Sequence, residues 1–388
     1  MRRAVTALVG VLVLLGGSAC TSPDEPPEDP TPVAVGWEQV SLPVPDGPAG
    51  RVGVRDAVAC EGTWWLVGTV FTGGDGTRPA AWRSDDDGRT WRPLRFAPRA
   101  YWARRAVLSS VACRGDRVVM VGAKSGGAHG NPRVSTWYQR GDGAFVDVIA
   151  PFPLFGGVEA VSVERVAAGP SEWLIAGNRT SGAAVWVSQD EREFELVDDD
   201  PALGRDERVD TLAIAQVHDG EGWTVVGSGQ VEGRIVPMAW VSPDGRAWSR
   251  QEVPAGQTFT ELQRVAATGD GVLAVGLRDG AVGSWRRTGS DWVAGESFGP
   301  LDPDRAAFAG PSGLVASGDR ALATASDGTS YAAWATLDSS SWRPVEVPVN
   351  PAAGGGRVLT VAATDETLLL LADDGLAGRV WRASWPAG

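Results

Sequence analysis

The chain has 388 residues, and its 35 basic and 48 acidic side chains give a formal net charge of −13. This acidic balance disfavours a nucleic-acid partner, and 43% apolar with 21% charged residues excludes wholesale disorder. Two histidines and three cysteines leave little material for a zinc site, so we expect neither a metal nor another cofactor.

The N-terminal segment predicts export. Two arginines precede a largely apolar run over residues 4–15, and small residues follow up to Cys20. This order is typical of a secretory signal peptide, and the run is shorter than the roughly 20 residues that span a bilayer. Cysteine after Ser-Ala resembles the bacterial lipobox, although Gly17 stands where that pattern usually has leucine. The resemblance implies removal of residues 1–19 and lipidation of Cys20; plain secretion and an uncleaved anchor stay open.

Residues 20–36 predict an extended tether, because the stretch is rich in proline and acids and cannot build a core. No later stretch approaches membrane length. A single lysine against 34 arginines resembles the usage of a high-GC bacterial genome. We therefore expect a bacterial protein held at the outer side of the cell membrane, or otherwise secreted.

A repeated pattern fills the rest of the chain. A tryptophan preceded by small or apolar residues recurs seven times, and a second aromatic follows each of the first six by seven to nine residues. The first set is Trp82, Trp137, Trp186, Trp240, Trp285, Trp334 and Trp381, and the second is Trp91, Phe145, Phe194, Trp248, Trp292 and Trp342. Upstream of most lie a Val-Ala-small segment and an apolar run that usually ends in glycine. Each unit of about 50 residues thus predicts four short strands with turns between them.

Seven such units predict an all-β fold, a seven-bladed β-propeller over residues 37–388. Residues 357–383 supply three strands of a last blade, and residues 37–40 supply a lone fourth strand at the start. Pairing the two would close the ring and hide both edges. The alternative, two packed β-sandwiches, does not explain seven matching units or the split blade.

One predicted turn carries a recognisable motif. The first unit reads Ser-Asp-Asp-Asp-Gly-Arg-Thr-Trp between its third and fourth strands, and its Ser84, Asp86, Gly88, Thr90 and Trp91 match the pattern Ser-x-Asp-x-Gly-x-Thr-Trp. The match resembles the Asp-box, or BNR repeat, of sialidase-like propellers and of many non-catalytic relatives. Serine and aspartate side chains bond nearby backbone amides, and glycine adopts positive φ in tight turns. We interpret the motif as a structural turn, with a calcium or ligand site as the alternative.

A shortened version of the motif occupies the same point of the fourth unit. It comprises Ser242, Asp244, Gly245 and Trp248. Recurrence at one point of the repeat supports the fold and says little about function.

The resemblance invites a glycosidase hypothesis. Sialidases use an arginine triad for the substrate carboxylate, an aspartate acid/base and a tyrosine nucleophile paired with glutamate. The closest string to their Arg-Ile-Pro motif begins at Arg234 and is interrupted by one residue. Of Tyr101, Tyr138 and Tyr331, neither of the last two lies where a central nucleophile is obvious. We therefore assign no catalytic residue; three arginines converging on the axis with a Tyr–Glu pair would support the enzyme.

The two histidines complete no serine-hydrolase set. His129 and His218 both fall in predicted loops, and no Gly-x-Ser-x-Gly elbow accompanies them. Solvated surface histidines are the favoured interpretation.

One loop is a candidate ligand-binding rim. In a propeller, the connections from a fourth strand to the next first strand share a face with the second-to-third loops, and Arg99, Tyr101, Trp102, Arg104 and Arg105 fall in one of them. Aromatic rings beside guanidinium groups suit a sugar, an anion or an acidic protein patch. The alternative is that the rings pack over the blade end while the arginines pair with nearby acids. Further candidates in or near such loops are Phe152, Phe155, Arg133, Arg179, Arg205, Arg208 and Arg234.

Cys60 and Cys113 occupy equivalent places in the first two units. Adjacent innermost strands can bring such positions within the Cα separation of a disulfide, and an exported protein is in an oxidising setting. A disulfide and two independent small core residues are both open at this point.

Together these patterns favour a monomeric, lipid-anchored binding or scaffolding module at the cell envelope, with a protein or glycan ligand. A sialidase-like hydrolase is one alternative, and an assembly factor for a membrane complex, a role of some Asp-box propellers, is another.

Overall fold

The structure is a computed structural model that describes residues 31–126, 132–338 and 340–386. The predicted signal peptide 1–19, Cys20 and His129 lie outside the described residues, as does most of the predicted tether. The chain from Pro32 onward forms one compact unit. No helix in the described ranges is long and apolar enough to cross a membrane.

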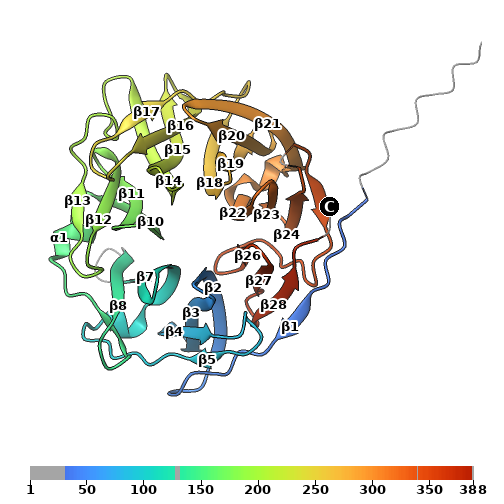
Figure 1. The fold of residues 1–388 in the computed structure, drawn as a ribbon. Helices are drawn as coiled ribbons and strands as arrows, with labels where there is room; N and C mark the ends of the chain where they lie inside the picture. Colours follow the sequence, from blue (N-terminus) through green and yellow to red (C-terminus); the bar gives the residue numbers. More distant parts are fainter. Residues whose placement is uncertain (1–30, 127–131, 339, 387–388) are drawn as a thin grey trace, which may run out of the picture. The chain divides into compact units, whose positions relative to one another are not determined.

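Seven four-stranded antiparallel sheets follow one another in a ring (Figure 1). Blade 1 comprises β2 (Arg51–Cys60), β3 (Thr63–Gly73), β4 (Gly76–Ser84) and β5 (Arg92–Pro93). Blade 2 comprises β6 (Val107–Arg114), β7 (Arg117–Ser125), β8 (Pro132–Gln139) and β9 (Phe145–Asp147). Blade 3 comprises β10 (Ala160–Ala168), β11 (Trp173–Arg179), β12 (Gly182–Ser188) and β13 (Glu195–Val197). Blades 4 and 5 are β14 (Val209–His218), β15 (Trp223–Val231), β16 (Arg234–Ser242) and β17 (Ser249–Gln251); and β18 (Thr260–Thr268), β19 (Gly271–Arg278), β20 (Ala281–Thr288) and β21 (Asp291–Pro300).

Blade 6 comprises β22 (Ala309–Ser317), β23 (Arg320–Asp327), β24 (Tyr331–Thr336) and β25 (Arg343–Val345). Blade 7 comprises β26 (Val358–Ala363), β27 (Thr367–Asp373) and β28 (Gly378–Ser384), and β1 (Glu38–Val40) completes it as the fourth strand. The predicted seven-bladed fold and its closure by the N-terminal strand are thus confirmed.

The chain joins the propeller earlier than the predicted end of the tether at residue 36. Val33 forms a parallel bridge with Val345 at the outer edge of blade 6 and is buried against it. Its N–H donates to the carbonyl of Pro344 at 2.7 Å. The apolar Val33 and Val35 allow this pairing, whereas the prolines and acids before them do not.

The repeated tryptophans pack the blades together. The first set lies on the third strands, and all its members except Trp334 are buried. The second set lies at or just before the fourth strands, and all six of its side chains are buried. Trp91, for example, packs with Leu369 and Ala362 of the neighbouring blade. Most of the tryptophan content therefore stabilises contacts between sheets.

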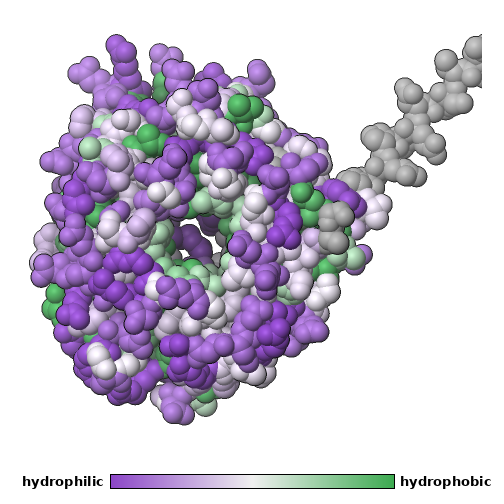
Figure 2. Space-filling view, in the orientation of Figure 1, coloured by the Kyte–Doolittle hydropathy of each residue, from purple (hydrophilic) through white to green (hydrophobic). Residues whose placement is uncertain are grey.

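The ring has two faces, which differ in the connections that they carry. The loop face carries the connections into each first strand and the second-to-third loops, including the short helix α1 (Phe152–Phe155) and the 3-10 turns Ala103–Arg105 and Pro303–Phe308. The turn face carries the tight first-to-second and third-to-fourth turns. Figure 2 shows the opening at the centre of the ring.

Side-chain links join neighbouring blades at six of the seven seams on the turn face, within the part of the chain that the structure describes. They are a disulfide, three ion pairs and two hydrogen bonds between neutral and charged groups. In order from the seam of blades 7 and 1, they are Asp87–Arg382, Cys60–Cys113, Arg117–Glu191, Trp223–Glu172, Arg287–Asp219 and Ser317–Asp365.

Candidate functional site

The Asp-box-like turn of blade 1 satisfies its own polar groups. The Ser84 hydroxyl donates to Asp86 at 2.7 Å and accepts the N–H of Gly88 at 2.9 Å. Asp86 also accepts the hydroxyl and N–H of Thr90, at 2.6 and 2.9 Å, and these bonds lower its pKa to about 2. Gly88 has φ of +79°, and its carbonyl accepts the indole N–H of Trp91 at 3.0 Å. This geometry is that of a structural turn.

The shortened turn of blade 4 keeps part of this pattern. Asp244 accepts the Ser242 hydroxyl at 3.1 Å and two backbone N–H groups at 2.9 and 3.1 Å. Gly245 again has positive φ, at +70°, and accepts the indole N–H of Trp248 at 3.1 Å. Asp86 and Asp244 thus both hold the backbone of their turns.

Cys60 and Cys113 are bonded to each other at the turn-face ends of β2 and β6. Their Cα atoms lie 6.0 Å apart, which is a usual separation for a disulfide. The bond links blades 1 and 2 covalently.

The predicted rim residues divide into several environments. Arg99 donates to the backbone carbonyl of Asp147 at 3.1 Å and therefore serves a structural contact. Tyr101 and Trp102 meet edge to face, with ring centroids 5.0 Å apart, and Arg105 lies over the Tyr101 ring at 4.7 Å.

Arg104 points elsewhere. It lines a separate cavity with Pro98, Arg95 and Arg78, towards blade 1. The structure therefore does not bring all five rim residues together around one ligand.

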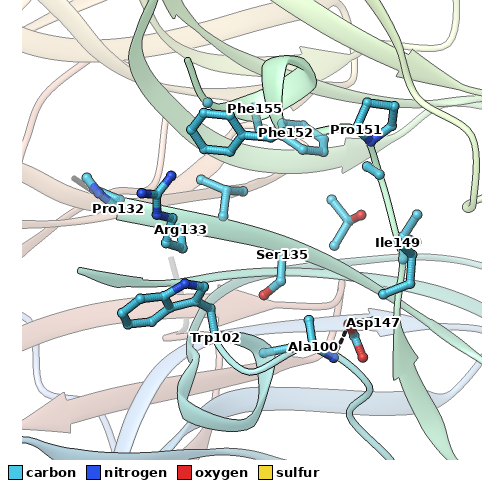
Figure 3. Close-up of a pocket in the computed structure, with 16 residues that line it drawn as sticks. Ala100, Trp102, Pro132, Arg133, Ser135, Asp147, Ile149, Pro151, Phe152 and Phe155 are labelled. Carbon is cyan, nitrogen blue, oxygen red and sulfur yellow. Dashed lines mark hydrogen bonds between the residues drawn. The ribbon is translucent and has the colours of Figure 1, made fainter. Parts of the chain in front are cut away.

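Trp102 instead lines a pocket over blade 2 (Figure 3), which we call the rim pocket. Its volume is about 220 Å³. The indole of Trp102 forms one side, and Phe152 and Phe155 of α1 form the opposite side, with Arg133 of β8 at one end. Arg133 stacks on Phe152 at 4.7 Å. Of the predicted rim loop, Trp102 is the aromatic residue that reaches this pocket, together with Phe152, Phe155 and Arg133 from the further candidates.

A second cavity, of about 350 Å³, lies at the axis on the loop-face side. Arg55 of β2, Arg165 of β10 and Arg264 of β18 line it together with Tyr331 and Phe308. The first strands of six blades contain a register shift at this level. Such bulges re-aim side chains, which explains why these arginines reach the axis.

Acidic groups already hold two of the three axial arginines. Arg55 donates to the buried Asp373 at 2.6 Å, and Arg165 pairs with the buried Asp56. Arg264 donates to two backbone carbonyls, at 2.6 and 3.2 Å, and burial lowers its pKa to about 10. It has no ion-pair partner among the described residues. Arg264 is therefore the guanidinium best placed to meet an incoming anion.

Tyr331 lies at the axial cavity, where the sequence did not place it. Its hydroxyl donates to the carbonyl of Arg357 at 3.3 Å, and burial raises its pKa although Arg264 lies nearby. Glu164, whose pKa burial also raises, bonds Ser162 instead. Three arginines and a tyrosine thus meet at the axis, but no Tyr–Glu hydrogen bond joins them within the described chain.

The sequence held a signal for two of these arginines. Arg165 and Arg264 each begin an Arg-Val-Ala-Ala string, immediately before the small-residue segment used to recognise the repeats. The interrupted motif at Arg234 does not supply an axial arginine, because Arg234 donates to the carbonyl of Gln257 near the outer loops.

His218 lies at the end of β14 rather than free in a loop. Its ring meets that of Trp223 edge to face at 5.0 Å, and its Nδ1 accepts the N–H of Gly220 at 3.0 Å. No group of three or more His, Cys, Asp or Glu side chains in the described ranges could hold a metal ion.

Exposed apolar side chains gather on one face. Eleven large ones are exposed among the described residues, and ten of them lie on loop-face connections or in the loop-face half of a first strand. The ten are Val44, Tyr101, Ile149, Phe152, Val158, Val161, Leu212, Phe259, Phe308 and Leu376. Val293, on the outer strand β21, is the exception.

The fold defines the chain as a β-propeller protein, and comparison with known proteins agrees at that level. No family model matches the sequence, and no curated protein matches it. The β-propeller domain of the Trilobed protease from Pyrococcus furiosus is similar, with a TM-score of 0.52 and 10% identity over 85% of this chain and 93% of that domain. That domain has an open velcro topology, whereas here β1 pairs with β28.

Two further similarities involve larger proteins. Acylaminoacyl peptidase from Pyrococcus horikoshii gives a TM-score of 0.50 at 11% identity over 86% of this chain and 52% of the peptidase, so this chain spans about half its length. Sialidase from Trypanosoma rangeli, bound to 2,3-difluorosialic acid, gives 0.48 at 10% identity over 91% of this chain and 59% of the sialidase. At such identities the similarities show the fold alone.

Proposed function

We propose that the protein is an exported, lipid-anchored propeller that binds a protein or glycan partner through its loop face at the outer side of the cell membrane. The observation that carries this proposal is the placement of ten of the eleven exposed large apolar side chains on that face. Four of the ten, Ile149, Phe152, Val158 and Val161, lie in or next to one connection, between blades 2 and 3. Contiguous exposed apolar surface marks interaction sites. On the turn face, in contrast, side chains form links between neighbouring blades.

Residues 33–40 run from the turn face towards the loop face. The bridge of Val33 to β25 is parallel, and a fourth strand runs toward the loop face. The segment therefore enters from the turn-face side.

Site-specific photo-cross-linking in the native envelope tests this function. A benzophenone amino acid at Phe259 or Phe308 is expected to give a discrete adduct with an envelope protein or glycan, because both side chains are exposed on the loop face. The same amino acid at Val293, which is exposed on an outer strand, is the matched control. Equal labelling from Val293, or no adduct from either loop-face position, would contradict the proposal. An adduct with a membrane complex would point to an assembly factor.

Lipid anchoring is tested separately. The Cys20→Ser variant is expected to lose its lipid by mass spectrometry and to move from the membrane fraction to the medium. Retention of the variant in the membrane fraction would contradict this part of the proposal.

A sialidase-like hydrolase is the second candidate, and the axial cavity favours it. Arg55, Arg165, Arg264 and Tyr331 are the residue types that sialidases use to hold a carboxylate and form the covalent intermediate. Two facts oppose it: Asp373 and Asp56 already occupy two of the guanidiniums, and burial raises the pKa of Tyr331, which disfavours the phenolate. A fluorogenic sialoside decides the question, because turnover that Tyr331→Phe abolishes would establish the enzyme.

A further inference from the structure

We propose that the rim pocket receives one large apolar side chain of a partner polypeptide, while a carboxylate beside that side chain binds Arg133. The inference rests on the proposed function and names the kind of partner for one part of the loop face.

The two walls of the rim pocket are held in place before any ligand arrives. Trp102 packs so closely on Gly126 that a Cβ there would lie 2.1 Å from the indole. On the opposite wall Phe155 is buried against Trp186, with ring centroids 5.5 Å apart, and it fixes α1 and the neighbouring Phe152. Pre-formed walls reduce the ordering cost of binding.

The size of the pocket favours a single inserted side chain. Its volume is about 220 Å³, and a second hollow of about 600 Å³ adjoins it, because Arg133, Phe152 and Phe155 line both. Anchor residues of protein partners fill small pockets within a larger interface, so the second hollow gives room for the chain that carries the anchor. The pocket therefore matches a side chain carried by a larger partner.

The surroundings of the pocket also fit a polypeptide. Ile149, Phe152, Val158 and Val161 are all more than half exposed near its mouth, and Val158 is 91% exposed. A glycan would need several free hydrogen-bonding groups, and the pocket offers few: the Ser135 hydroxyl accepts the indole N–H of Trp137 and donates to a carbonyl. Within the described chain, this leaves the Thr136 hydroxyl and Arg133 without hydrogen-bond partners. An apolar ring around an apolar pocket is the arrangement of a protein interface core.

The charge at the mouth specifies an acidic neighbour. Arg133 lies over Phe152 at 4.7 Å, and within the described chain its Nε has no hydrogen-bond partner and its guanidinium no ion pair. The carboxylate of the pocket, Asp147, is buried and already accepts the N–H groups of Arg99 and Ala100 at 2.5 and 3.0 Å. A guanidinium left without an acid, in a chain of net charge −13, favours a carboxylate from the partner.

A displayed peptide library tests the inference with the full-length protein purified from membranes in detergent. The probe is a phage library of random 12-residue peptides, panned against the wild-type protein with counter-selection on Phe152→Ser. Enriched peptides are expected to share a large apolar residue beside Asp or Glu. A synthetic copy is expected to lose about tenfold or more in affinity on Phe152→Ser and on Arg133→Ala, which is the scale of an interface anchor.

Two controls separate the pocket from the rest of the loop face. Phe259→Ser removes an exposed aromatic of the same face outside the pocket and is expected to leave the peptide affinity unchanged. Replacing the peptide's acid with lysine is expected to weaken binding to the wild-type protein. The same replacement is expected to cause little further loss of affinity for the Arg133→Ala variant, because both changes remove the same interaction.

Several results would overturn the inference. They are the absence of any apolar–acidic consensus, peptide binding that Phe152→Ser and Arg133→Ala leave intact, and glycan-array binding that Phe152→Ser abolishes. If photo-cross-linking from Phe259 or Phe308 still captures a partner, the assignment of the pocket fails alone. If those positions also give nothing, the proposed function fails with it.

Discussion

The two faces of the propeller use their side chains in opposite ways. On the turn face, acids, a disulfide and an indole join neighbouring blades, as at Asp87–Arg382 and Cys60–Cys113. On the loop face, large apolar side chains such as Phe308 stay exposed, and Arg264 meets no acid in the described chain. Side chains also join blades on the loop-face side, so the contrast is one of degree. Asp373 binds Arg51 and Arg55 there, Asn178 bonds Ala213, and Ser228 donates to Glu261. Groups that stabilise the ring are therefore concentrated at the turn-face ends of the strands, and groups available for recognition at the loop-face ends.

The largest effect on stability is expected from the disulfide. Cys60 and Cys113 are 53 residues apart, and a loop of that length corresponds to roughly 4 kcal/mol of denatured-state entropy. The Cys60→Ser, Cys113→Ser double variant is expected to unfold at a lower denaturant midpoint, measured by tryptophan fluorescence. Dithiothreitol should lower the midpoint of the wild type and leave the double variant unchanged. A midpoint that resists both treatments would show that this seam does not limit unfolding.

The second-largest effect on stability is expected from the ion pair of Asp87. Asp87 binds Arg382 and accepts the Thr367 hydroxyl at 2.8 Å, both across the seam that closes the ring. Asp87→Ala leaves the largely buried guanidinium without its acid, at a cost of about 1.5–3 kcal/mol. The matched control is Asp85→Ala, which removes a neighbouring acid from exposed ion pairs worth about 1 kcal/mol or less.

The loss of stability in the Asp87→Ala variant is expected to depend on pH. Burial alone would raise the pKa of Asp87, but hydrogen bonds from Arg382 and Thr367 bring it below its usual value. A depressed carboxyl pKa contributes stability that is present above the unfolded pKa and is lost as pH falls through the folded one. The stability difference between wild type and Asp87→Ala should therefore shrink below about pH 4. A difference that is constant from pH 7 to pH 3 would contradict the role of the charge.

A smaller effect is expected at the glycine of the blade 1 turn. Gly88 has φ of +79°, and a Cβ there would lie 3.1 Å from Leu369 of blade 7. Gly88→Ala is expected to destabilise by about 1 kcal/mol through its backbone conformation, plus the cost of moving Leu369. Gly62→Ala is the control, because its φ of +78° is nearly equal and no atom lies within 4 Å. Equal losses in the two variants would show that Leu369 gives way freely.

The fold was predictable from the sequence because the repeats are local patterns. The tryptophan pairs and the lone strand before the first unit determine blade number and closure without any distant contact. The axial cavity was not predictable in the same way, because Arg55, Arg165 and Arg264 lie more than 90 residues apart and reach the axis through bulges that sequence periodicity does not report. The rim was predicted as one cluster, but Trp102 and Arg104 diverge because the Ala103–Arg105 turn directs them to different cavities.

The smallest effect on stability is expected from substitution of an exposed side chain on the loop face. Phe308 is 54% exposed at the mouth of the axial cavity, and an exposed side chain of this kind changes stability by no more than about 0.5 kcal/mol when replaced. Phe308→Ser should therefore keep the denaturant midpoint of the wild type while it reduces the yield of partner cross-linked from Phe259. Val293→Ser, on the outer strand, should change neither quantity. If Phe308→Ser destabilises the fold as much as Gly88→Ala does, the loop face takes part in stability and the separation of the two faces is wrong.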